Sequence, residues 1–537
     1  MNAVASPVAA PEVGLATPNA HAALRACAQR WPRREGLVFA QAGRRLSFAQ
    51  WQAEAEALAG SLRALGVQPG DRVALWAENR AEWAVALVAL AALGAVLVPV
   101  NTHFRDDELL HVMKHCDARV LMLSERFRSN AYLEMALAGR GELPAMREIV
   151  CFDDVDRPGV RRYRDLIAVA ADRFEPAAIA PGTLGSIQYT SGTTGRPKGA
   201  SLSFDGMMLN AVLTARRLGL GESDRWTSII PLFHCAGCIM NLMGCLAAGA
   251  TYVGVPAFDA EGMLQLIQDE RCTLLTGVPT SFLAMLQHPA RERYDLRSLR
   301  AGTCGGADCD PAVLERCATE FPIPGLVQVY GQTEASTLIS LDDPDSPERW
   351  RTAGKALDGT AVRITHPETR VPLQVGEIGQ IEVRGPIVML GYHAQPDETA
   401  RTIDADGWLQ TGDLGRLRDD GRLVVSGGRL RDMIIRGGEN IYPVEIENAL
   451  RLHPAVAEVA VFGEPDTYYG ETVSACVSLR ETASAADLAA SLKGRIAAFK
   501  LPLRYYRVER WPMTASGKIR KRELQEWAAA ATLEPLP

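Results

Sequence analysis

Short apolar runs alternate with helical patterns from about residue 46 to about residue 358 of this 537-residue chain. Each run is short and ends in a small or polar turn. Such alternation predicts an α/β fold with largely parallel strands, in which ligands bind beyond the carboxyl ends of the strands. The runs that predict buried strands are residues 72–76, 95–98, 120–123, 148–152, 226–230, 273–276, 299–303 and 326–330.

The pattern changes after about residue 358. Runs at 361–365, 379–384 and 422–426 are separated by glycine-rich turns and predict a small β-rich subdomain. The last hundred residues predict a compact unit with a helix from Pro443 to about 452, strands near 458–462 and 472–479, and a helix over 486–499. We therefore expect a disordered segment at 1–19, an N-terminal domain at 20–428, a hinge at 429–431 and a C-terminal domain at 432–537.

One apolar stretch has the length of a membrane span. Residues 83–100 form 18 positions without a charge. A helix that ends at Gly94, followed by a buried strand that Pro99 stops, explains the stretch better. The first twenty residues lack the basic start and apolar run of a signal peptide. We expect a cytoplasmic protein with no integral membrane segment, and peripheral membrane contact stays open.

Composition narrows the function classes. A net charge of -7 gives no electrostatic case for nucleic-acid binding, and 11 scattered cysteines suit a reducing compartment. His234, Cys235, Cys238 and Cys245 raise the alternative of a zinc site. Because the three cysteines lie in one apolar run and no second pair has finger spacing, packed thiols are the favoured interpretation.

The segment 189–199 reads Tyr-Thr-Ser-Gly-Thr-Thr-Gly-Arg-Pro-Lys-Gly and follows a predicted strand. Its three glycines let several backbone N–H groups point one way, and its hydroxyls and Lys198 add donors and a cation. Such a loop suits a polyphosphate, although no Gly-Lys-Ser/Thr opens a helix as in a P-loop. A glycine- and threonine-rich surface turn is the alternative if the loop is taken alone.

The loop resembles the signature of the adenylate-forming superfamily, which includes acyl-CoA synthetases, aryl-CoA ligases, nonribosomal-peptide adenylation domains and firefly luciferase. Further motifs follow in the family's order, from about residue 20 to 525. The resemblance implies an α/β fold, with a large multi-layer N-terminal domain and a small mobile α+β C-terminal domain. It also implies an enzyme that makes an acyl-adenylate from ATP and an acid, with Mg2+, and then a thioester. The chain looks most like medium-chain and other fatty acyl-CoA ligases.

Residues 330–334 are similar to the family's Tyr-Gly-x-Thr-Glu motif, which implies Tyr330 beside the adenine, Thr333 at the α-phosphate and Glu334 on Mg2+. In the Thr-Gly-Asp motif Asp413 would accept hydrogen bonds from the ribose hydroxyls. The alternatives are a solvated carboxylate for Glu334 and a turn-forming Asp413. The implied nucleotide-binding set is Thr190, Ser191, Gly192, Thr193, Thr194, Gly195, Gly305, Gly306, Ala307, Tyr330, Gly331, Gln332, Thr333, Asp413, Arg429 and Lys518.

The remaining roles also come from the resemblance. Lys518 matches the catalytic lysine, and the implied catalytic set is Lys518, Glu334, Thr333 and Lys198. The implied acid pocket comprises His234, Cys235, Gly237, Gly305 and Gln332, although a lone histidine is by default a core residue. The implied CoA contacts are Gly437, Gly438, Glu439 and Tyr442. Arg431 stands at the implied hinge position, where the family usually has Lys or Asp, and it keeps that position polar.

The substrate is the least constrained part of the hypothesis. Residues 233–237 carry no acidic side chain to pair with an amine, so an amino acid is disfavoured. We expect a medium-chain or other apolar aliphatic or alicyclic acid as substrate, with an aryl acid as runner-up and ATP and CoA as co-substrates. An enzyme that loads a carrier protein and a non-catalytic relative are the other classes. The oligomeric state is open, and a homodimer is one candidate.

Overall fold

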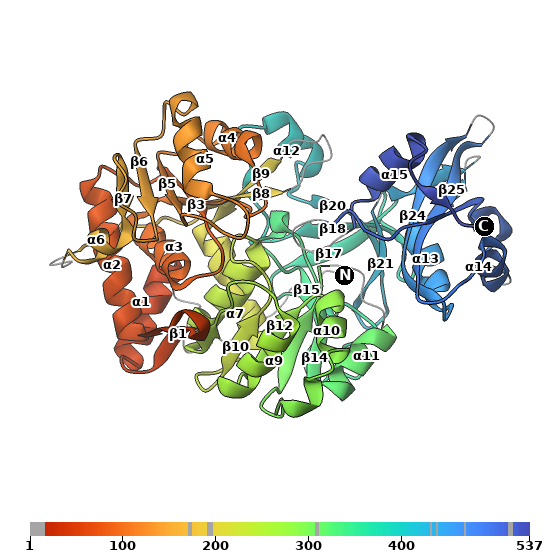
Figure 1. Ribbon diagram of the computed structural model, residues 1–537, viewed down its shortest axis with the longest axis horizontal. Helices are drawn as coiled ribbons and strands as arrows, with labels where there is room; N and C mark the ends of the chain where they lie inside the picture. Colours follow the sequence, from red (N-terminus) through yellow and green to blue (C-terminus); the bar gives the residue numbers. More distant parts are fainter. Residues whose placement is uncertain are drawn as a thin grey trace. The chain divides into compact units, whose positions relative to one another are not determined.

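The computed structural model describes residues 17–169, 174–190, 197–306, 311–429, 432–436, 439–466, 469–493, 495–513 and 519–537. The chain divides into two compact units (Figure 1). The first unit comprises the chain up to Ala361 together with Val383–Leu409, and the second comprises Val362–Glu382 and Gln410–Pro537. The hinge at 429–431 stays a prediction.

Two mixed sheets organise the described residues of the first unit. The nine-stranded sheet has the order β16 (Lys355–Ala356), β15 (Ser340–Leu341), β14 (Gly325–Tyr330), β13 (Ala301–Cys304), β12 (Leu274–Gly277), β10 (Arg225–Ser228), β11 (Thr251–Val253), β1 (Glu35–Phe39), β2 (Arg44–Ser47). The eight-stranded sheet has the order β19 (Gly391–Tyr392), β9 (Lys198–Ser203), β8 (Leu184–Thr190), β4 (Val96–Pro99), β3 (Arg72–Trp76), β5 (Val120–Leu123), β6 (Glu148–Cys151), β7 (Val160–Arg162).

The inner strands of both sheets pair in parallel, as predicted. The strands β11, β10, β12, β13 and β14 form consecutive parallel pairs, and so do β4, β3, β5 and β6. Antiparallel pairs occur toward the ends of the sheets, at β1–β2, β14–β15 and β8–β9. The predicted strands lie at or close to the observed ones. Continuous apolar runs made them detectable, because both faces of these strands are covered by helices.

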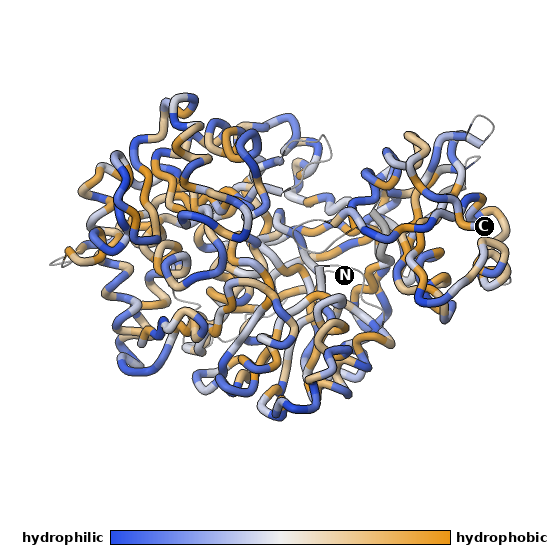
Figure 2. Tube along the Cα trace, in the orientation of Figure 1, coloured by the Kyte–Doolittle hydropathy of each residue, from blue (hydrophilic) through white to orange (hydrophobic). Residues whose placement is uncertain are grey.

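Helices cover the outer face of each sheet and fill the space between the sheets. The helices α9 (Ala260–Asp269), α10 (Pro279–Leu286) and α11 (Pro311–Glu320) pack on the nine-stranded sheet, and α4 (Asp106–His115) and α5 (Tyr132–Gly139) pack on the eight-stranded one. Between the sheets lie α1 (Ala20–Arg30), α2 (Phe48–Ala64), α3 (Ala81–Leu93), α7 (Phe204–Arg217), a π-helix (Ala236–Met243) and α8 (Gly244–Ala248). Two short helices, α6 (Tyr163–Ile167) and α12 (Pro396–Thr402), complete the unit. Figure 2 shows apolar segments along the strands and polar loops around them.

The apolar stretch 83–100 is core, as predicted. The residues of α3 are buried on nearly every side, which is typical of a helix between two sheets. Gly94 ends the helix with a φ of 68°, in the left-handed region that favours glycine. The strand β4 follows directly. In the part of the chain that the structure describes, no helix is long and apolar enough to cross a membrane.

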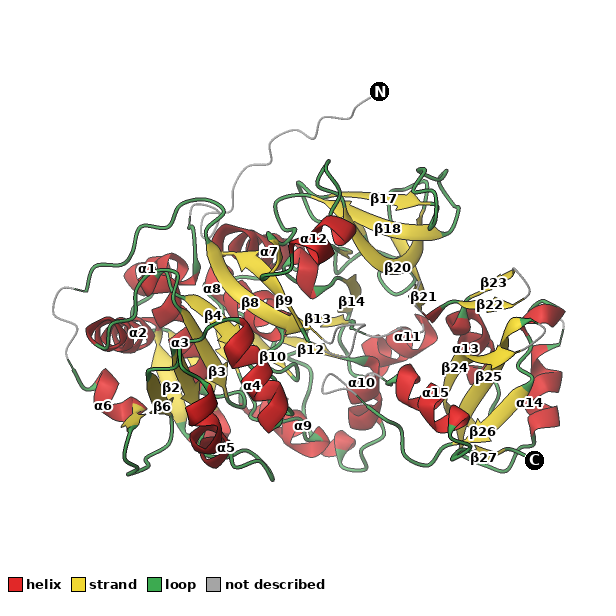
Figure 3. Ribbon diagram, turned by 90° about the horizontal axis from the view of Figure 1, so that it is seen from above, coloured by secondary structure: helices red, strands yellow, loops and turns green. Residues whose placement is uncertain are grey.

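The second unit contains a four-stranded sheet in the order β17 (Ala361–Thr365), β18 (Gly379–Arg384), β20 (Leu409–Leu417), β21 (Leu423–Arg429). This is the predicted β-rich region. Its second sheet has the order β23 (Glu439–Ile441), β22 (Ile434–Arg436), β25 (Gly470–Leu479), β26 (Arg504–Arg507), β27 (Glu534–Pro535), with β24 (Val456–Asp466) paired to β25. Around it lie α13 (Pro443–Arg451), α14 (Ala485–Leu492) and α15 (Lys521–Ala529) (Figure 3).

One predicted helix is wrong in length. The prediction extended it over 486–499, whereas α14 ends at Leu492. The C-cap residue Lys493 is extended, and Gly494 follows it in the sequence. Glycine at this place favours a helix end, and Ala498 and Phe499 beyond it belong to a separate 3₁₀ turn at Ala498–Lys500.

Candidate functional site

The predicted phosphate loop joins two antiparallel strands. Thr190, at the end of β8, pairs with Lys198, at the start of β9. A Cβ added to Gly199 would lie 2.6 Å from Ile187 Cγ2, so only glycine fits at this position. The pairing of β8 with β9 therefore fixes the positions of Thr190 and Lys198, from which the loop extends. The loop residues of the prediction that lie outside the described ranges are Ser191, Gly192, Thr193, Thr194 and Gly195.

Lys198 is largely buried, with 12% of its side chain exposed, and it is partnered on two sides. Its Nζ forms an ion pair with Glu398 of α12 and lies 5.4 Å from the ring centroid of Tyr392. The hydrogen bond from Lys198 lowers the pKa of Glu398, so the carboxylate stays charged at neutral pH. The cation that the resemblance assigns to phosphate binding is thus held in place by an acidic side chain.

The segment 330–334 forms a tight turn at the carboxyl end of β14. Gln332 occupies the N-cap position of a 3₁₀ helix at Thr333–Ala335, and Ser336 and Thr337 follow with φ values of 54° and 121°. Positive φ is costly for residues other than glycine and often marks functional sites. A Cβ on Gly331 would lie 1.8 Å from the Thr337 carbonyl oxygen. The turn closes on itself only because residue 331 is glycine.

Glu334 is held at both its backbone and its side chain. Its carbonyl accepts a hydrogen bond of 2.8 Å from the Met389 N–H, and its Oε1 accepts one of 2.9 Å from the Tyr392 hydroxyl. A carboxylate is a suitable Mg2+ ligand, because Mg2+ usually takes one or two carboxylates and completes its shell with water and phosphate oxygens. The described residues contain no group of three or more potential metal ligands. With one oxygen held by Tyr392, the Glu334 carboxylate fits a Mg2+ that binds together with a nucleotide.

The predicted acid-pocket segment contacts this turn. His234 ends a turn in which its N–H donates to the Pro231 carbonyl at 3.0 Å, and its Nδ1 accepts from the Ala236 N–H at 3.2 Å. Cys235 Sγ lies 3.5 Å from Thr333 Oγ1. Burial would raise the pKa of the Cys235 thiol, but His234 and hydrogen bonds from Thr333 and Thr337 lower it below its usual value. The structure thus places Cys235 against Thr333, with His234 Nδ1 3.7 Å from Cys235 Sγ.

A buried polar network holds the π-helix that follows His234. The Asn241 amide and Thr303 Oγ1 lie 2.9 Å and 2.8 Å from Thr276 Oγ1, and the Trp226 indole donates to the same oxygen at 3.0 Å. These residues belong to the π-helix and to β10, β12 and β13. π-helices are rare and are frequent at functional sites. A Cβ on Gly237 would lie 2.2 Å from the Pro231 carbonyl oxygen, so glycine is required at the start of this helix.

The predicted adenine turn follows β13. A Cβ on Gly305 would lie 2.5 Å from Val329 Cγ2 on the neighbouring β14, and Gly306 has a φ of 77°. Both features require glycine and leave the backbone free of side chains at this strand end. Ala307 lies outside the described residues. Gly305, Gly306 and Tyr330 are therefore placed at the carboxyl ends of adjacent strands.

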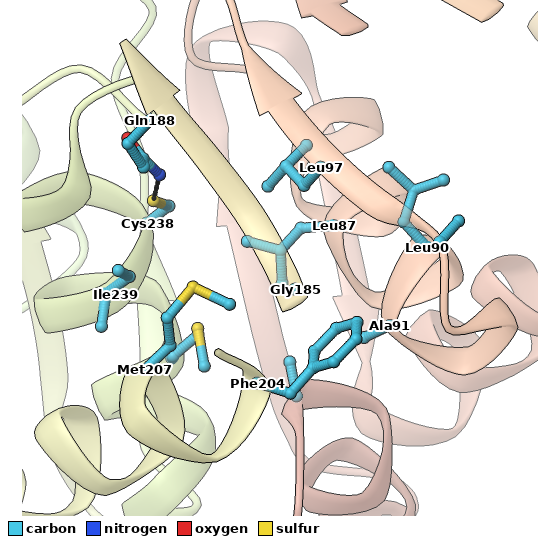
Figure 4. A pocket seen from close by; sticks show the side chains of 13 residues that line it. Leu87, Leu90, Ala91, Leu97, Gly185, Gln188, Phe204, Met207, Cys238 and Ile239 are labelled. Atoms are coloured by element: carbon cyan, nitrogen blue, oxygen red, sulfur yellow. Dashed lines mark hydrogen bonds between the residues drawn. The ribbon is translucent and has the colours of Figure 1, made fainter. Parts of the chain in front are cut away.

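A cavity of about 20 Å³ lies where α3, α7 and the π-helix meet β4 and β8 (Figure 4). Its lining is apolar except for Gln188, which donates a hydrogen bond of 3.5 Å to Cys238 Sγ. A cavity of this volume holds roughly one water molecule. It cannot accommodate a medium-chain acid without movement of the π-helix or of α7.

The second unit carries the predicted ribose contact. Asp413 on β20 is 8% exposed, and its N–H donates to Thr411 Oγ1 at 3.1 Å. Asp413 pairs with Arg429 in the β20–β21 ladder, so two residues assigned to the nucleotide lie opposite each other. Glu439 lies on β23, and Tyr442 precedes α13, where burial raises its pKa. Arg431, Gly437, Gly438 and Lys518 lie outside the described residues.

The chain on either side of Lys518 is anchored. Met513 and Ile519 form an antiparallel bridge, and the Arg520 N–H donates to the Pro512 carbonyl at 2.7 Å. After it, α15 is tied down because Lys521 Nζ lies 2.6 Å from Oε1 of Glu447, which is 3% exposed. Met513 and Ile519, which flank the segment 514–518, therefore lie next to each other in the second unit.

Sequence reasoning missed Tyr392 and Glu398. Tyr392 is 58 positions from Glu334, and Glu398 is 200 positions from Lys198. No local periodicity links residues so far apart. The one sequence signal was the polar composition of residues 392–402 directly after an apolar run.

Sequence reasoning also missed three histidines beside the strands of the phosphate loop. His115 Nδ1 lies 2.8 Å from the Tyr189 hydroxyl, His111 Nε2 lies 3.3 Å from the Pro197 carbonyl, and the His393 ring is 5.5 Å from that of His115. Burial lowers the pKa of His115, and His393 and His111 lower it further. Burial and Arg72 lower the pKa of His393, whereas Asp117 raises both.

We predict that acid destabilises the first unit through this cluster. The unfolded chain takes up protons near a pKa of 6.5, whereas His115 and His393 resist protonation in the folded state. Stability is therefore full above about pH 7 and declines as the pH falls below 6.5. The melting temperature of the wild type should fall more between pH 7.5 and 5.5 than that of a His115→Gln/His393→Gln variant. A His366→Gln variant, altered at an exposed position, is the control, and equal slopes in all three proteins would contradict the prediction.

We also predict that Gly331→Ala disrupts the turn after β14. The added Cβ must displace the Thr337 carbonyl, which moves Thr333 and Glu334. A misplacement of about 1 Å at such a site costs on the order of 10²-fold in rate. The measurement is ATP–pyrophosphate exchange with an accepted acid. Gly141→Ala is the control, because a Cβ there meets nothing within 4 Å, and an unchanged exchange rate in Gly331→Ala would refute the assignment.

Comparison with known families agrees with this geometry. The family model of AMP-binding enzymes matches residues 24–393, and that of the AMP-binding enzyme C-terminal domain matches residues 445–518. The first match includes the phosphate loop, the acid-pocket segment and the turn after β14. The second ends at Lys518.

Named relatives are similar over nearly the whole chain. The mitochondrial medium-chain acyl-CoA ligase ACSF2 of Mus musculus is 34% identical over 531 residues, covering 94% of this chain and 86% of its own length. A CoA ligase of Rhodococcus jostii (strain RHA1), named for a methyl-dioxo-octahydroindenyl propanoyl substrate, is 36% identical over 494 residues, covering 90% of this chain and 94% of its own.

A solved structure has the same fold. The anthranilate CoA ligase AuaEII in complex with anthranoyl-AMP superposes with a TM-score of 0.86 at 28% identity, covering 96% of this chain and 98% of that one. The predicted α/β fold and the predicted superfamily are confirmed. The chain belongs to the family of AMP-binding enzymes, the adenylate-forming superfamily.

Proposed function

We propose that this enzyme is an ATP-dependent carboxylic acid:CoA ligase. An acid and ATP give an acyl-adenylate and pyrophosphate, and attack by the CoA thiol then gives acyl-CoA and AMP. The contact between Cys235 and Thr333 carries the proposal, because it joins the segment assigned to the acid with the turn assigned to the α-phosphate. The named CoA ligases among the relatives support the same reaction.

The first step brings two anions together. The acid carboxylate attacks the α-phosphorus of ATP, and pyrophosphate leaves, so positive charge must offset repulsion and stabilise the transition state. Lys198 would supply one charge at the phosphate loop, and Lys518 another. Glu334 would hold Mg2+, which neutralises phosphate charge when bound. Little proton transfer is needed, because the acid is already ionised and pyrophosphate leaves as an anion.

The second step exchanges AMP for the CoA thiol on the acyl group. Lys518 and the predicted CoA residues Gly437, Gly438, Glu439 and Tyr442 all belong to the proposed C-terminal domain at 432–537. One domain would thus serve both half-reactions in two poses, turning at a hinge near Arg431 relative to the domain at 20–428. Asp413 and Arg429 would hold the nucleotide through both steps.

The substrate class is proposed from the pocket segment. Residues 233–237 carry no acid that could pair with an amine, and the π-helix beyond them is apolar. This favours a medium-chain or alicyclic acid. The substrates named for ACSF2 and for the ligase of Rhodococcus jostii are of these kinds. An aryl acid is the second candidate, supported by the similarity to AuaEII, and transfer to a carrier protein is the alternative second step. A cytoplasmic location and a homodimer stay predictions.

A panel of acids tests the proposal. AMP release is measured with ATP, Mg2+ and CoA for each acid, and then with a phosphopantetheinylated carrier protein in place of CoA. The panel comprises aliphatic acids of four to twelve carbons, alicyclic propanoic acids, benzoic acids and amino acids. We expect the highest kcat/KM with a medium-chain or alicyclic acid and CoA. Higher activity with the carrier protein would redirect the proposal to a loading enzyme. No AMP release with any acid would refute it.

Removal of Lys518 tests the catalytic assignment. In the adenylation step Lys518→Ala removes a cation aimed at the reacting phosphate, which typically costs about 10²–10³-fold in rate. Pyrophosphate release in the absence of CoA measures this step alone. Lys493→Ala, which removes an exposed lysine of the same unit, should change the rate less than twofold. Near-normal adenylation by Lys518→Ala would rule out the assignment.

A further inference from the structure

The backbone of Tyr392 is fixed between two elements of the first unit. In β19 it pairs with Ala200 of β9, and its N–H donates to Thr399 Oγ1 of α12 at 2.8 Å. The preceding Gly391 has a φ of 140°, and a Cβ there would lie 2.8 Å from Thr399 Cγ2. Only glycine allows β19 to lie this close to α12. The position of the Tyr392 ring is therefore set by the fold before any ligand binds.

The hydroxyl of Tyr392 is a donor to Glu334 at neutral pH. A carboxylate oxygen only accepts hydrogen bonds, whereas a phenol hydroxyl can donate one. The 2.9 Å bond to Glu334 Oε1 therefore runs from tyrosine to carboxylate. The Tyr392 ring also has a cationic neighbour, because Lys198 Nζ lies 5.4 Å from the ring centroid.

The same stretch of chain holds the backbone of Glu334. The Met389 N–H donates to the Glu334 carbonyl, three residues before Tyr392 holds the side chain. A carboxylate group rotates readily about its terminal bond, and a donor fixed on one oxygen sets the plane in which the other oxygen points. Such second partners of a metal-binding carboxylate orient it and tune its affinity for the metal.

We infer that Tyr392 is a positioning residue, which orients the Glu334 carboxylate to bind the Mg2+ that accompanies ATP. The inference rests on the proposed function and deepens it by adding a residue outside the family motif at 330–334. Tyr392 acts through Glu334 and does not itself contact the reacting atoms. Its removal should therefore weaken metal binding in the nucleotide complex more than it lowers the rate at saturating metal.

Replacement of one oxygen atom tests the inference. Tyr392→Phe removes the hydroxyl and keeps the ring beside Lys198. Tyr163→Phe is the matched control, because the Tyr163 hydroxyl donates to Glu54 Oε1 at 2.8 Å in the same unit but between α6 and α2. Binding of Mn2+ to each enzyme with ATP, without an acid, is measured from the loss of the free-ion electron paramagnetic resonance signal. The Mg2+ dependence of ATP–pyrophosphate exchange and the melting temperature are measured in parallel.

For Tyr392→Phe we expect Mn2+ affinity to fall about tenfold and the Mg2+ concentration for half-maximal exchange to rise by a similar factor. High Mg2+ should restore most of the exchange rate, and Tyr163→Phe should match the wild type in both readouts. Three results would overturn the inference and leave the proposed function standing. They are a wild-type Mn2+ affinity in Tyr392→Phe, an equal loss of Mn2+ affinity in both variants, and a loss of exchange rate that high Mg2+ does not restore. A wild type with no exchange for any acid would overturn the proposed function and the inference with it.

Discussion

The close approach of Gly331 to the Thr337 carbonyl is the contact on which the arrangement of the candidate site depends. It lets the chain leave β14, form the short helix with Thr333 and Glu334, and return to pair as β15. The positive φ values at Ser336 and Thr337 are the cost of this reversal. With the turn in place, Thr333 meets Cys235, and Glu334 meets Met389 and Tyr392.

Local signals in the sequence predicted most of the fold. The buried strands β3 and β5 are mostly apolar runs, and Thr333 follows the carboxyl end of β14, where parallel sheets place ligands. Lys198 begins β9, opposite Thr190 at the carboxyl end of β8. The prediction failed where contacts are distant or where an apolar pattern crosses a break. Tyr392 and Glu398 act on partners far away in the sequence, and the pattern at 486–499 continued through the helix end at Leu492.

The two units divide the proposed chemistry between them. The first unit carries the phosphate-loop strands, the acid-pocket segment and the Glu334 turn, and its helices are packed on both faces of two sheets. The second carries Asp413, and the ends of the segment containing Lys518 are joined there by the Met513–Ile519 bridge. The residues proposed for phosphate, Mg2+ and acid are thus on the larger unit, whereas those proposed for the ribose, for CoA and for catalysis by Lys518 are on the smaller one.

The ion pair of Lys198 with Glu398 makes any anion that uses this lysine a competitor of an internal carboxylate. Because a lysine ammonium has three N–H donors, a polyphosphate that binds Lys198 would either share it with Glu398 or displace Glu398. Because Lys198 is largely buried and Glu398 is partly buried, this competition responds less to salt than a pair between exposed side chains would. The ion pair would therefore lower the affinity of the site for every anion that uses Lys198. It would limit retention of a polyphosphate product as much as binding of a polyphosphate substrate.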